Sequence, residues 1–175
     1  MFRPMRRGKQ LLPPEESIQI LEQGTSGVLA VAGDAGYPYA VPLSYVYTDG
    51  KLYFHCAKSG HKLDAIRRNS KASFCVIGQD AVVPLEYTTY FRSVIAFGQI
   101  RIVEDPACVQ RAIQQLACKY APADSPEHRQ QAIDRELAAL CILEMEIEHI
   151  TGKEAIELVG RSAPVPGPLP PRKKE

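Results

Sequence analysis

The chain has 175 residues, of which 45% are hydrophobic and 23% charged, with a formal net charge of +1. A chain of this length buries a sizeable core in one domain, and its near-neutral charge argues against a nucleic-acid-binding surface. No apolar run approaches the roughly 20 residues that a membrane span needs. The basic first residues lack the apolar core of a signal peptide, so we expect a cytoplasmic protein.

The predicted domain plan has three parts. Residues 1–12 form a basic arm, residues 13–160 a single domain, and residues 161–175 a proline-rich tail that we expect to be disordered. Five cysteines form no C-x-x-C pair, and the four histidines show no metal-ligand spacing. Reduced thiols and no zinc site are therefore expected.

The first predicted elements are a helix and two strands. A helix begins at Pro13 and ends at Gly24, because proline suits a first helical turn and glycine a helix end. Residues 27–33 form a strand, and residues 37–47 form a longer one that contains Pro42. Proline cannot donate a ladder hydrogen bond, so part of this strand is expected at a sheet edge, a bulge or a ligand.

A hairpin and a short helix follow. The turn at residues 48–50, Thr-Asp-Gly, leads into a strand over Lys51–Ala57. A helix then runs over residues 60–69, with Ser59 as its expected N-cap, and a strand follows over residues 71–78.

The last predicted elements are long. Residues 88–105 form one strand, bent or bulged near Gly98. Helices cover residues 106–119 and 125–140, and residues 141–150 form an alternating final strand. About six strands without regular β–α alternation predict a mainly β fold, a small antiparallel barrel with peripheral helices. No G-x-G-x-x-G follows a strand, which disfavours a Rossmann fold.

Two cations occupy an unusual place in the helix over residues 60–69. His61 and Lys62 lie in its first turn, where free N–H groups already make the field positive and acidic residues are expected. A bound phosphate would explain them; solvent exposure of both side chains is the plain alternative, since a misplaced cation costs only ~0.3–1 kcal/mol. The preceding strand carries Tyr53 and His55 on one face, leading toward this helix, and an apolar set on the other.

Three stretches resemble a known family: FHCAKSGHKLD (residues 54–64), SVIAFG (93–98) and EHITGKEA (148–155). They resemble the FMN-binding split-barrel proteins, in particular the Nim-type branch of nitroimidazole-resistance-like proteins related to pyridoxamine 5′-phosphate oxidase. The resemblance runs from about residue 27 to residue 155. It implies a six-stranded antiparallel split barrel that forms a homodimer, with two FMN sites built from both subunits.

The resemblance also implies which residues meet the flavin. His61 and Lys62 would hold the phosphate, and Ser93 would reach the flavin from the facing region. The backbone of the second strand would line the ring, and the end of the third strand would lie along ribityl and ring. These further cofactor-binding residues are Val41, Pro42, Leu43, Ser44, His55, Cys56 and Ala57.

The implied activity is an FMN-dependent oxidoreductase that passes electrons from a donor such as NAD(P)H to a small planar acceptor such as a nitroimidazole. FMN is expected rather than FAD, and His55 is the candidate catalytic residue. The chain lacks tryptophan and the arginine- and histidine-containing tail motif of genuine pyridoxamine phosphate oxidases, so vitamin B6 oxidation is not expected.

Two other classes of function stay open at this point. One is a carrier or sensor that binds flavin or haem without catalysis, with His55 or His149 as an axial ligand. The other is an oligonucleotide-binding barrel that uses the basic residues at both ends of the chain. Near-zero net charge and the lack of a basic stripe between those ends speak against the second class.

Overall fold

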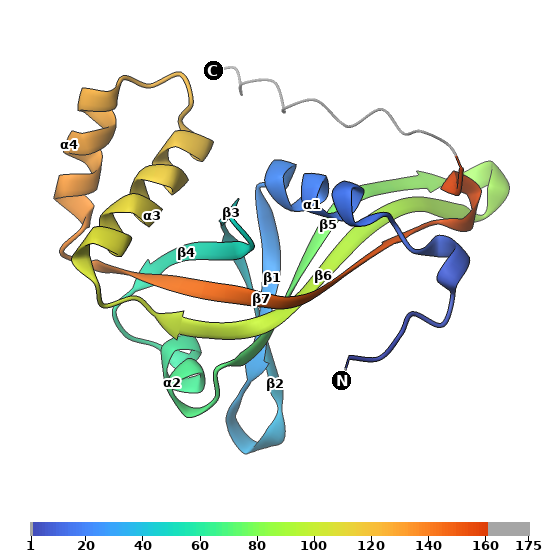
Figure 1. Ribbon diagram of the computed structural model, residues 1–175, viewed down its shortest axis with the longest axis horizontal. Helices are drawn as coiled ribbons and strands as arrows, with labels where there is room; N and C mark the ends of the chain where they lie inside the picture. The colour runs from blue at the N-terminus through green and yellow to red at the C-terminus, as the bar shows by residue number, and fades with distance from the viewer. Residues whose placement is uncertain (1, 161–175) are drawn as a thin grey trace.

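The computed structural model describes residues 2–160, so the predicted tail lies outside the described residues. Seven strands form one antiparallel sheet in the order β2-β1-β5-β6-β7-β4-β3, which confirms the mainly β class (Figure 1). The strands are β1 (Ser26–Ala32), β2 (Pro38–Ser44), β3 (Val46–Thr48), β4 (Lys51–Ala57), β5 (Lys71–Val83), β6 (Thr88–Ile102) and β7 (Leu140–Glu154).

The sheet is a split barrel, and it has seven strands where six were predicted. The additional strand arises because the strand breaks at Tyr45, between β2 and β3. The two edge strands, β2 and β3, are separated in the chain by this single residue, so the sheet must curl until its edges approach. The predicted strand over residues 37–47 is therefore wrong in one respect, because it breaks at Tyr45. The Tyr45 side chain is fully buried and its hydroxyl donates to the Leu21 carbonyl at 2.7 Å.

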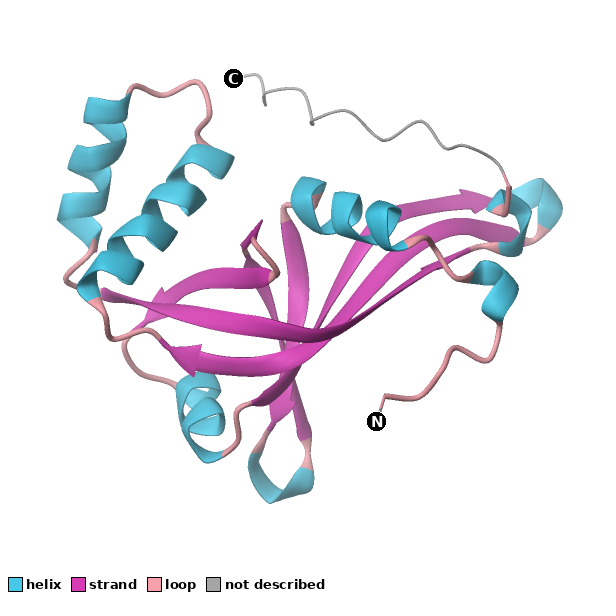
Figure 2. Cartoon of the chain, in the orientation of Figure 1, coloured by secondary structure: helices cyan, strands magenta, loops and turns pink. Residues whose placement is uncertain are grey.

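The described residues form four α-helices around the sheet (Figure 2). They are α1 (Pro14–Gln23), α2 (His61–Arg68), α3 (Pro106–Tyr120) and α4 (Pro126–Glu136). Helix α1 packs on β5, β6 and β7, helix α2 packs on β1 and β6, and α3 and α4 form a hairpin beside β4. Among residues 2–160, no helix combines the length and the apolar character required to cross a membrane.

Two apolar clusters hold these elements together. The larger one fills the barrel and includes Leu52 and Phe54 of β4, Phe74 of β5 and Leu63 of α2. The smaller one lies between the sheet and the α3–α4 hairpin. Its members on the sheet side include Ile142, so the two faces of β7 near its start are both covered.

Some predicted boundaries were confirmed and others were wrong. The strand over Lys51–Ala57 and the irregularity at Gly98, where the β6–β7 register shifts, were confirmed. Ser59 does not cap α2: Gly60 is the N-cap, and no side chain bonds there. Helix α4 ends at Glu136 rather than residue 140, because β7 begins at Leu140.

The first residues of the chain pack on the sheet. The Leu12 N–H donates to the Gly152 carbonyl at 3.0 Å, and the buried Gln10 amide donates to the Glu154 carbonyl at 2.9 Å. Phe2 stacks on His149 at 4.6 Å between ring centroids. The arm is therefore ordered by its own domain, along β7.

Candidate functional site

A groove of about 460 Å³ opens where β4 ends, and this volume lies within the range of small-molecule sites. It is lined by residues of β2, β4, α2 and the α4–β7 connection: Leu43, His55, Cys56, Ala57, Lys62, Glu136, Ala139 and Leu140. Five of the ten predicted site residues, Leu43, His55, Cys56, Ala57 and Lys62, thus lie together in one groove.

Lys62 provides the cationic end of this groove. It is half-buried and lines the groove, whereas Lys58 of the preceding loop is exposed. No side chain caps α2, and the Leu63 and Asp64 N–H groups donate to the Gly60 carbonyl, so the His61 and Lys62 N–H groups are the first-turn donors without an acceptor among the described residues. Two such N–H groups beside an ammonium are of the kind that binds anions in proteins.

Gly60 makes this helix start possible. Its φ of +129° lies in the region that L side chains rarely adopt. The chain can therefore turn sharply between the end of β4 and the first turn of α2. His61 and Lys62 therefore lie only a few residues after the end of β4, the strand that carries His55.

His61 lies beside the groove and has partners of its own. Its Nε2 is 3.4 Å from an Asp34 carboxylate oxygen, and its ring centroid is 4.1 Å from that of Tyr39. Asp34 also forms an ion pair with Arg68 at the other end of α2. His61 does not line the groove, so Lys62 is the better placed of the two predicted phosphate ligands.

The two faces of β4 bring different chemistry to the groove. His55 is exposed on the outer face, whereas Cys56 is buried among the core side chains. Burial, reinforced by a contact with Cys141, raises the pKa of the Cys56 thiol to about 12, although the Lys62 charge acts in the opposite direction. Cys56 is therefore a neutral thiol at physiological pH.

The β2 residues lie on an edge strand, as predicted from Pro42. Pro42 pairs with Val28 of β1, and β2 has no further strand on its other side. Val41 and Leu43 are half-buried and pack against the core, whereas Pro42 and Ser44 are exposed. Of this segment only Leu43 lines the groove.

Ser93 is placed away from the groove. It lies on the outer face of β6, opposite Ile77 of β5 and Lys153 of β7. Ile77 is 66% exposed, and the neighbouring row of Val28, Cys75 and Ile95 crosses three strands in register. Ser93 therefore belongs to an exposed apolar face of the sheet.

Three groove residues had no signal in the sequence. Glu136 ends α4, Ala139 lies in the connection to β7, and Leu140 is the first residue of β7. They join the groove because β7 pairs with β4 in an antiparallel register that sets Leu140 opposite Ala57. This pairing spans more than 80 residues of sequence and is set by tertiary structure.

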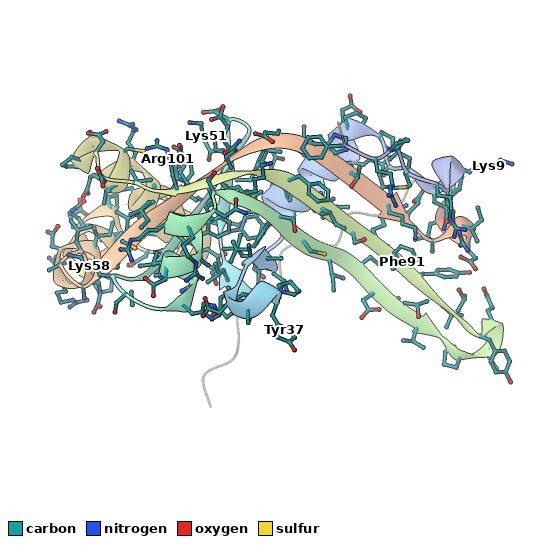
Figure 3. The ribbon with its side chains drawn as sticks, turned by 90° about the horizontal axis from the view of Figure 1, so that it is seen from below. Lys9, Tyr37, Lys51, Lys58, Phe91 and Arg101 are labelled. Carbon is teal, nitrogen blue, oxygen red and sulfur yellow. The ribbon has the colours of Figure 1, made fainter. Side chains whose placement is uncertain are left out.

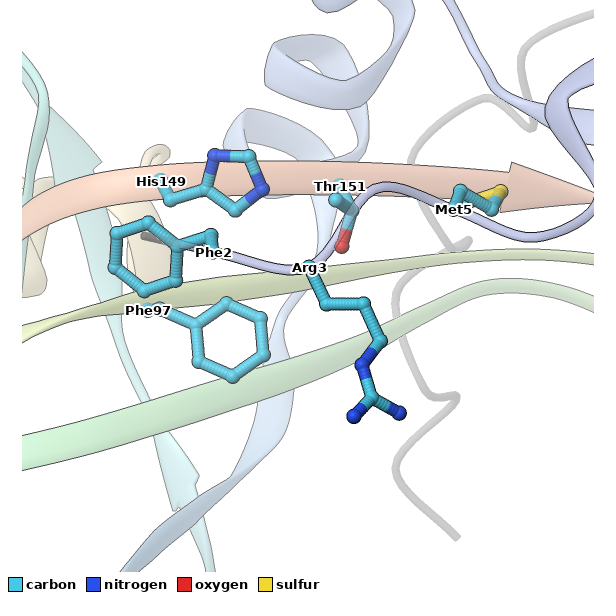
Figure 4. Close-up of a pocket in the computed structure, with 6 residues that line it drawn as sticks. All are labelled: Phe2, Arg3, Met5, Phe97, His149 and Thr151. Carbon is cyan, nitrogen blue, oxygen red and sulfur yellow. The ribbon is translucent and has the colours of Figure 1, made fainter.

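A second groove, of about 440 Å³, lies under the N-terminal arm (Figure 4). It is lined by Phe2, Arg3, Met5, Phe97, His149 and Thr151. In Figure 4 Phe2 lies over His149 and Phe97, so the arm itself occupies the aromatic part of this surface. The His149 ring is engaged by this stacking.

A buried carboxylate, Glu144, lies on the same strand pair as the groove. It accepts hydrogen bonds from the Tyr53 hydroxyl and the Arg101 guanidinium, each at 2.9 Å, and Lys51 is 3.4 Å away. Lys51 and Arg101 lie close together in Figure 3. Burial alone would raise the pKa of Glu144, but these hydrogen bonds and charges lower it overall. Glu144 of β7 thus connects three strands through its ion pairs with Lys51 of β4 and Arg101 of β6, and we interpret its role as structural.

Potential metal-ligating side chains do not cluster in the described part of the chain. Within residues 2–160, no three or more His, Cys, Asp or Glu side chains gather as potential ligands.

Solved structures with this fold include several flavin proteins. A putative 5-nitroimidazole antibiotic resistance protein from Bacteroides thetaiotaomicron is 19% identical, with a TM-score of 0.69 over 82% of this chain and 86% of that one. An FAD-binding protein from Mesorhizobium loti is 24% identical, with a TM-score of 0.59 over 83% of this chain and 97% of that one. An FAD- and haem-binding protein from Mycobacterium smegmatis is 22% identical, with a TM-score of 0.68 over 85% of this chain and 74% of that one.

These structural likenesses, all under 25% identity, show the fold. No curated protein matches the chain in sequence. The family model described as pyridoxamine 5′-phosphate oxidase matches residues 13–154, which is most of the chain and nearly all of the predicted domain. The chain therefore belongs to the pyridoxamine 5′-phosphate oxidase family, with its split-barrel fold.

Proposed function

We propose that the chain is an FMN-dependent oxidoreductase that transfers electrons from NAD(P)H to a small planar acceptor such as a nitroimidazole. The observation that carries this proposal is the groove at the end of β4. There Lys62 and the uncapped start of α2 lie next to Leu43, His55 and Cys56. The nitroimidazole resistance protein that shares the fold is the reason for naming this acceptor.

The residues present fit a flavin phosphate. A phosphate needs cationic and N–H donors, which Lys62 and the first turn of α2 supply. His61 adds a further donor beside them, partly engaged by Asp34. Glu136 is the one acidic residue of the groove lining, and its carboxylate disfavours a phosphate at that side. The phosphate is therefore assigned to the α2 side.

The remaining groove residues suit the uncharged part of the cofactor. Leu43, Ala57 and Leu140 offer apolar contact. The backbone of Val41–Ser44 lies on an edge strand, so N–H and C=O groups on its open side are available to the polar edge of a flat ring. We favour FMN over FAD for this groove, because Lys62 is the only cation among the lining residues and one terminal phosphate suffices to pair with it.

A bound flavin would supply the electron transfer, and the protein would bind and orient the reactants. His55 is exposed at the groove and is our candidate to hold an anionic group of the acceptor or to donate a proton to it. Cys56 stays neutral and packs against the bound cofactor rather than attacking it.

The site is proposed to be completed by a second copy of the chain. The outer face of the sheet exposes Val28, Ile77 and Ile95, and the β5–β6 hairpin projects beyond the body of the domain, with Tyr87 98% exposed near its tip (Figure 3). An apolar face of this kind is typical of a protein–protein interface. Ser93 lies on this face, so in a homodimer it can reach the partner's groove.

The proposal is tested on the full chain purified without added cofactor. An absorption spectrum of oxidised flavin, with FMN as the released compound, is expected. Anaerobic NAD(P)H should bleach the flavin, and a nitroimidazole should restore its colour. A protein that is colourless and does not take up added FMN would refute the proposal. A Soret band would identify the haem-binding alternative, and flavin that NAD(P)H does not bleach would identify a carrier.

The homodimer is tested separately by sedimentation. Ile77→Asp places a charge on the exposed face and is expected to shift the protein toward monomer and to lower its FMN content. Cys118→Asp, on the exposed side of α3, is the control. A wild-type protein that sediments as a monomer with full FMN content would contradict the shared site.

A further inference from the structure

Two cysteines face one another across the β4–β7 ladder. Cys56 and Cys141 are directly opposite in the antiparallel register, and their sulfur atoms are 3.5 Å apart. The Cys141 thiol is also 3.6 Å from the Ala57 carbonyl, to which it donates. Cys56 lines the candidate groove, and Cys141 follows Leu140 of the same lining.

The backbone geometry of this pair is compatible with a disulfide. Residues directly opposite in an antiparallel ladder have Cα atoms about 4.5–5.5 Å apart, which lies inside the range of about 4.4–6.8 Å that disulfides span. The two side chains are already on the same face and in contact. Bond formation then needs side-chain rotation together with a small adjustment of the strands.

The position in the ladder favours such an adjustment. Cys56 is the penultimate residue of β4, and Cys141 is the second residue of β7. Strand ends open more readily than strand centres, because fewer hydrogen bonds hold them. No other two cysteines of the described chain are in contact: Cys75 lies on the outer face of β5, and Cys108 and Cys118 lie on α3.

We propose that Cys56 and Cys141 form a reversible intrachain disulfide at the wall of the groove, with a low-molecular-weight disulfide such as oxidised glutathione as the oxidant. The Cys141 thiolate attacks the glutathione disulfide, forming a mixed disulfide and releasing one glutathione. Cys56 then loses its proton and attacks the Cys141 sulfur, releasing the second glutathione. One glutathione disulfide is reduced to two thiols while two protein thiols become one disulfide.

The environments of the two thiols assign these roles. Cys141 is half-buried and is the more accessible of the two, whereas Cys56 is only 9% exposed. Burial raises the pKa of Cys56, so its thiolate is scarce and it is poorly suited to attack first. Within the mixed disulfide it needs only to reach the neighbouring sulfur, where proximity compensates for its low thiolate fraction.

The disulfide would change the groove itself. Its formation draws the Cys56 sulfur toward β7 and removes a thiol proton from a wall that Lys62 also lines. The groove would thereby respond to the cellular thiol balance. The pairing rests on the strand register alone, so it holds or fails independently of the flavin proposal.

The test is a peptide map of the full, folded chain after incubation with oxidised glutathione. Trypsin releases Cys56 in residues 52–58 and Cys141 in residues 136–153, and neither peptide contains another cysteine. We expect a disulfide-linked pair of these peptides, the loss of two of the five titratable thiols, and reversal by reduced glutathione. The map is made on flavin-free and on FMN-treated protein.

Three variants separate this pairing from general thiol oxidation. Cys118→Ser, at an exposed cysteine, should leave the linked peptide unchanged. Cys56→Ser should stop at a glutathione adduct on Cys141, and Cys141→Ser should leave Cys56 as a free thiol. Circular dichroism verifies that each variant is folded. A wild-type protein that carries only glutathione adducts, or keeps both Cys56 and Cys141 reduced, would overturn the proposal.

Discussion

Lys62→Ala is the substitution that most directly tests the assignment of the phosphate end of the groove. Lys62 is the single cation among the lining residues, and it precedes the buried Leu63 in the first turn of α2. Its ammonium forms no ion pair in the described part of the chain, in contrast to His61, which is 3.4 Å from Asp34. Removal of Lys62 therefore changes the charge at the groove without freeing a buried carboxylate.

The magnitude follows from the burial of this side chain. A hydrogen bond to a charged group contributes about 1.5–3 kcal/mol, and Lys62 is only half-buried, so the lower end applies. About 1.5 kcal/mol corresponds to a roughly tenfold higher Kd for FMN. Riboflavin has the same ring and ribityl chain without the phosphate, so its Kd should change by less than about twofold.

The assay is a titration of flavin fluorescence with wild-type protein and each variant, using FMN and riboflavin in parallel. Lys58→Ala is the matched control, because Lys58 is exposed, lies four residues earlier and does not line the groove. The informative quantity is the ratio of the two Kd values. An equal loss of FMN and riboflavin binding in Lys62→Ala, or no loss of either, would refute the phosphate assignment.

Three further predictions concern the framework that holds the groove, and chemical denaturation measures all of them. Glu144→Gln should lower the free energy of unfolding by about 1–3 kcal/mol at pH 7. Because the folded-state pKa of Glu144 is lowered, this contribution is fully present above the ordinary value of 4.5, and the difference between the two proteins should be lost as the pH falls through the lowered folded-state pKa. Gly98→Ala should cost about 3 kcal/mol, because its Cβ would overlap a backbone carbonyl of β7, whereas Gly8→Ala meets no atom and should be neutral. Tyr120→Phe should cost about 1–3 kcal/mol, because the Tyr120 hydroxyl accepts a hydrogen bond from the Tyr45 N–H at 2.8 Å, and losses below about 0.5 kcal/mol would contradict that role.

Local sequence signals predicted most of the elements that build the groove. The Asp-Gly turn and the alternation of Lys51–Ala57 predicted the bounds of β4 and the side chains on each of its faces. Both signals are local, because a hairpin turn and a period-two alternation depend on neighbouring residues. The prolines of β2 predicted a sheet edge, a bulge or a ligand contact, and the structure places β2 at the sheet edge. The cations at the start of α2 were also visible, since the helix dipole makes their position unusual.

Local signals were weaker where neighbouring elements decide the outcome. By residue type, Tyr45 fits the predicted strand over residues 37–47. The strand breaks there because the Tyr45 hydroxyl donates to the Leu21 carbonyl of α1 and the Tyr45 N–H donates to the Tyr120 hydroxyl of α3. Ser59 is a good cap by residue type, but Gly60, with its positive φ, takes the N-cap position at the turn out of β4. Such choices depend on where the flanking elements are fixed in space.

The amino-acid sequence by itself determined most of the strands, the turn chemistry and the charges near α2, because these depend on side chains a few residues apart. Only the tertiary structure decided that Lys62 rather than His61 lines the groove, since Asp34 of the β1–β2 connection and Tyr39 of β2 engage the imidazole. The tertiary structure also brought Glu136 and Leu140 to the groove and set Cys141 against Cys56. Antiparallel register joins residues far apart in the chain, and no local pattern encodes that pairing.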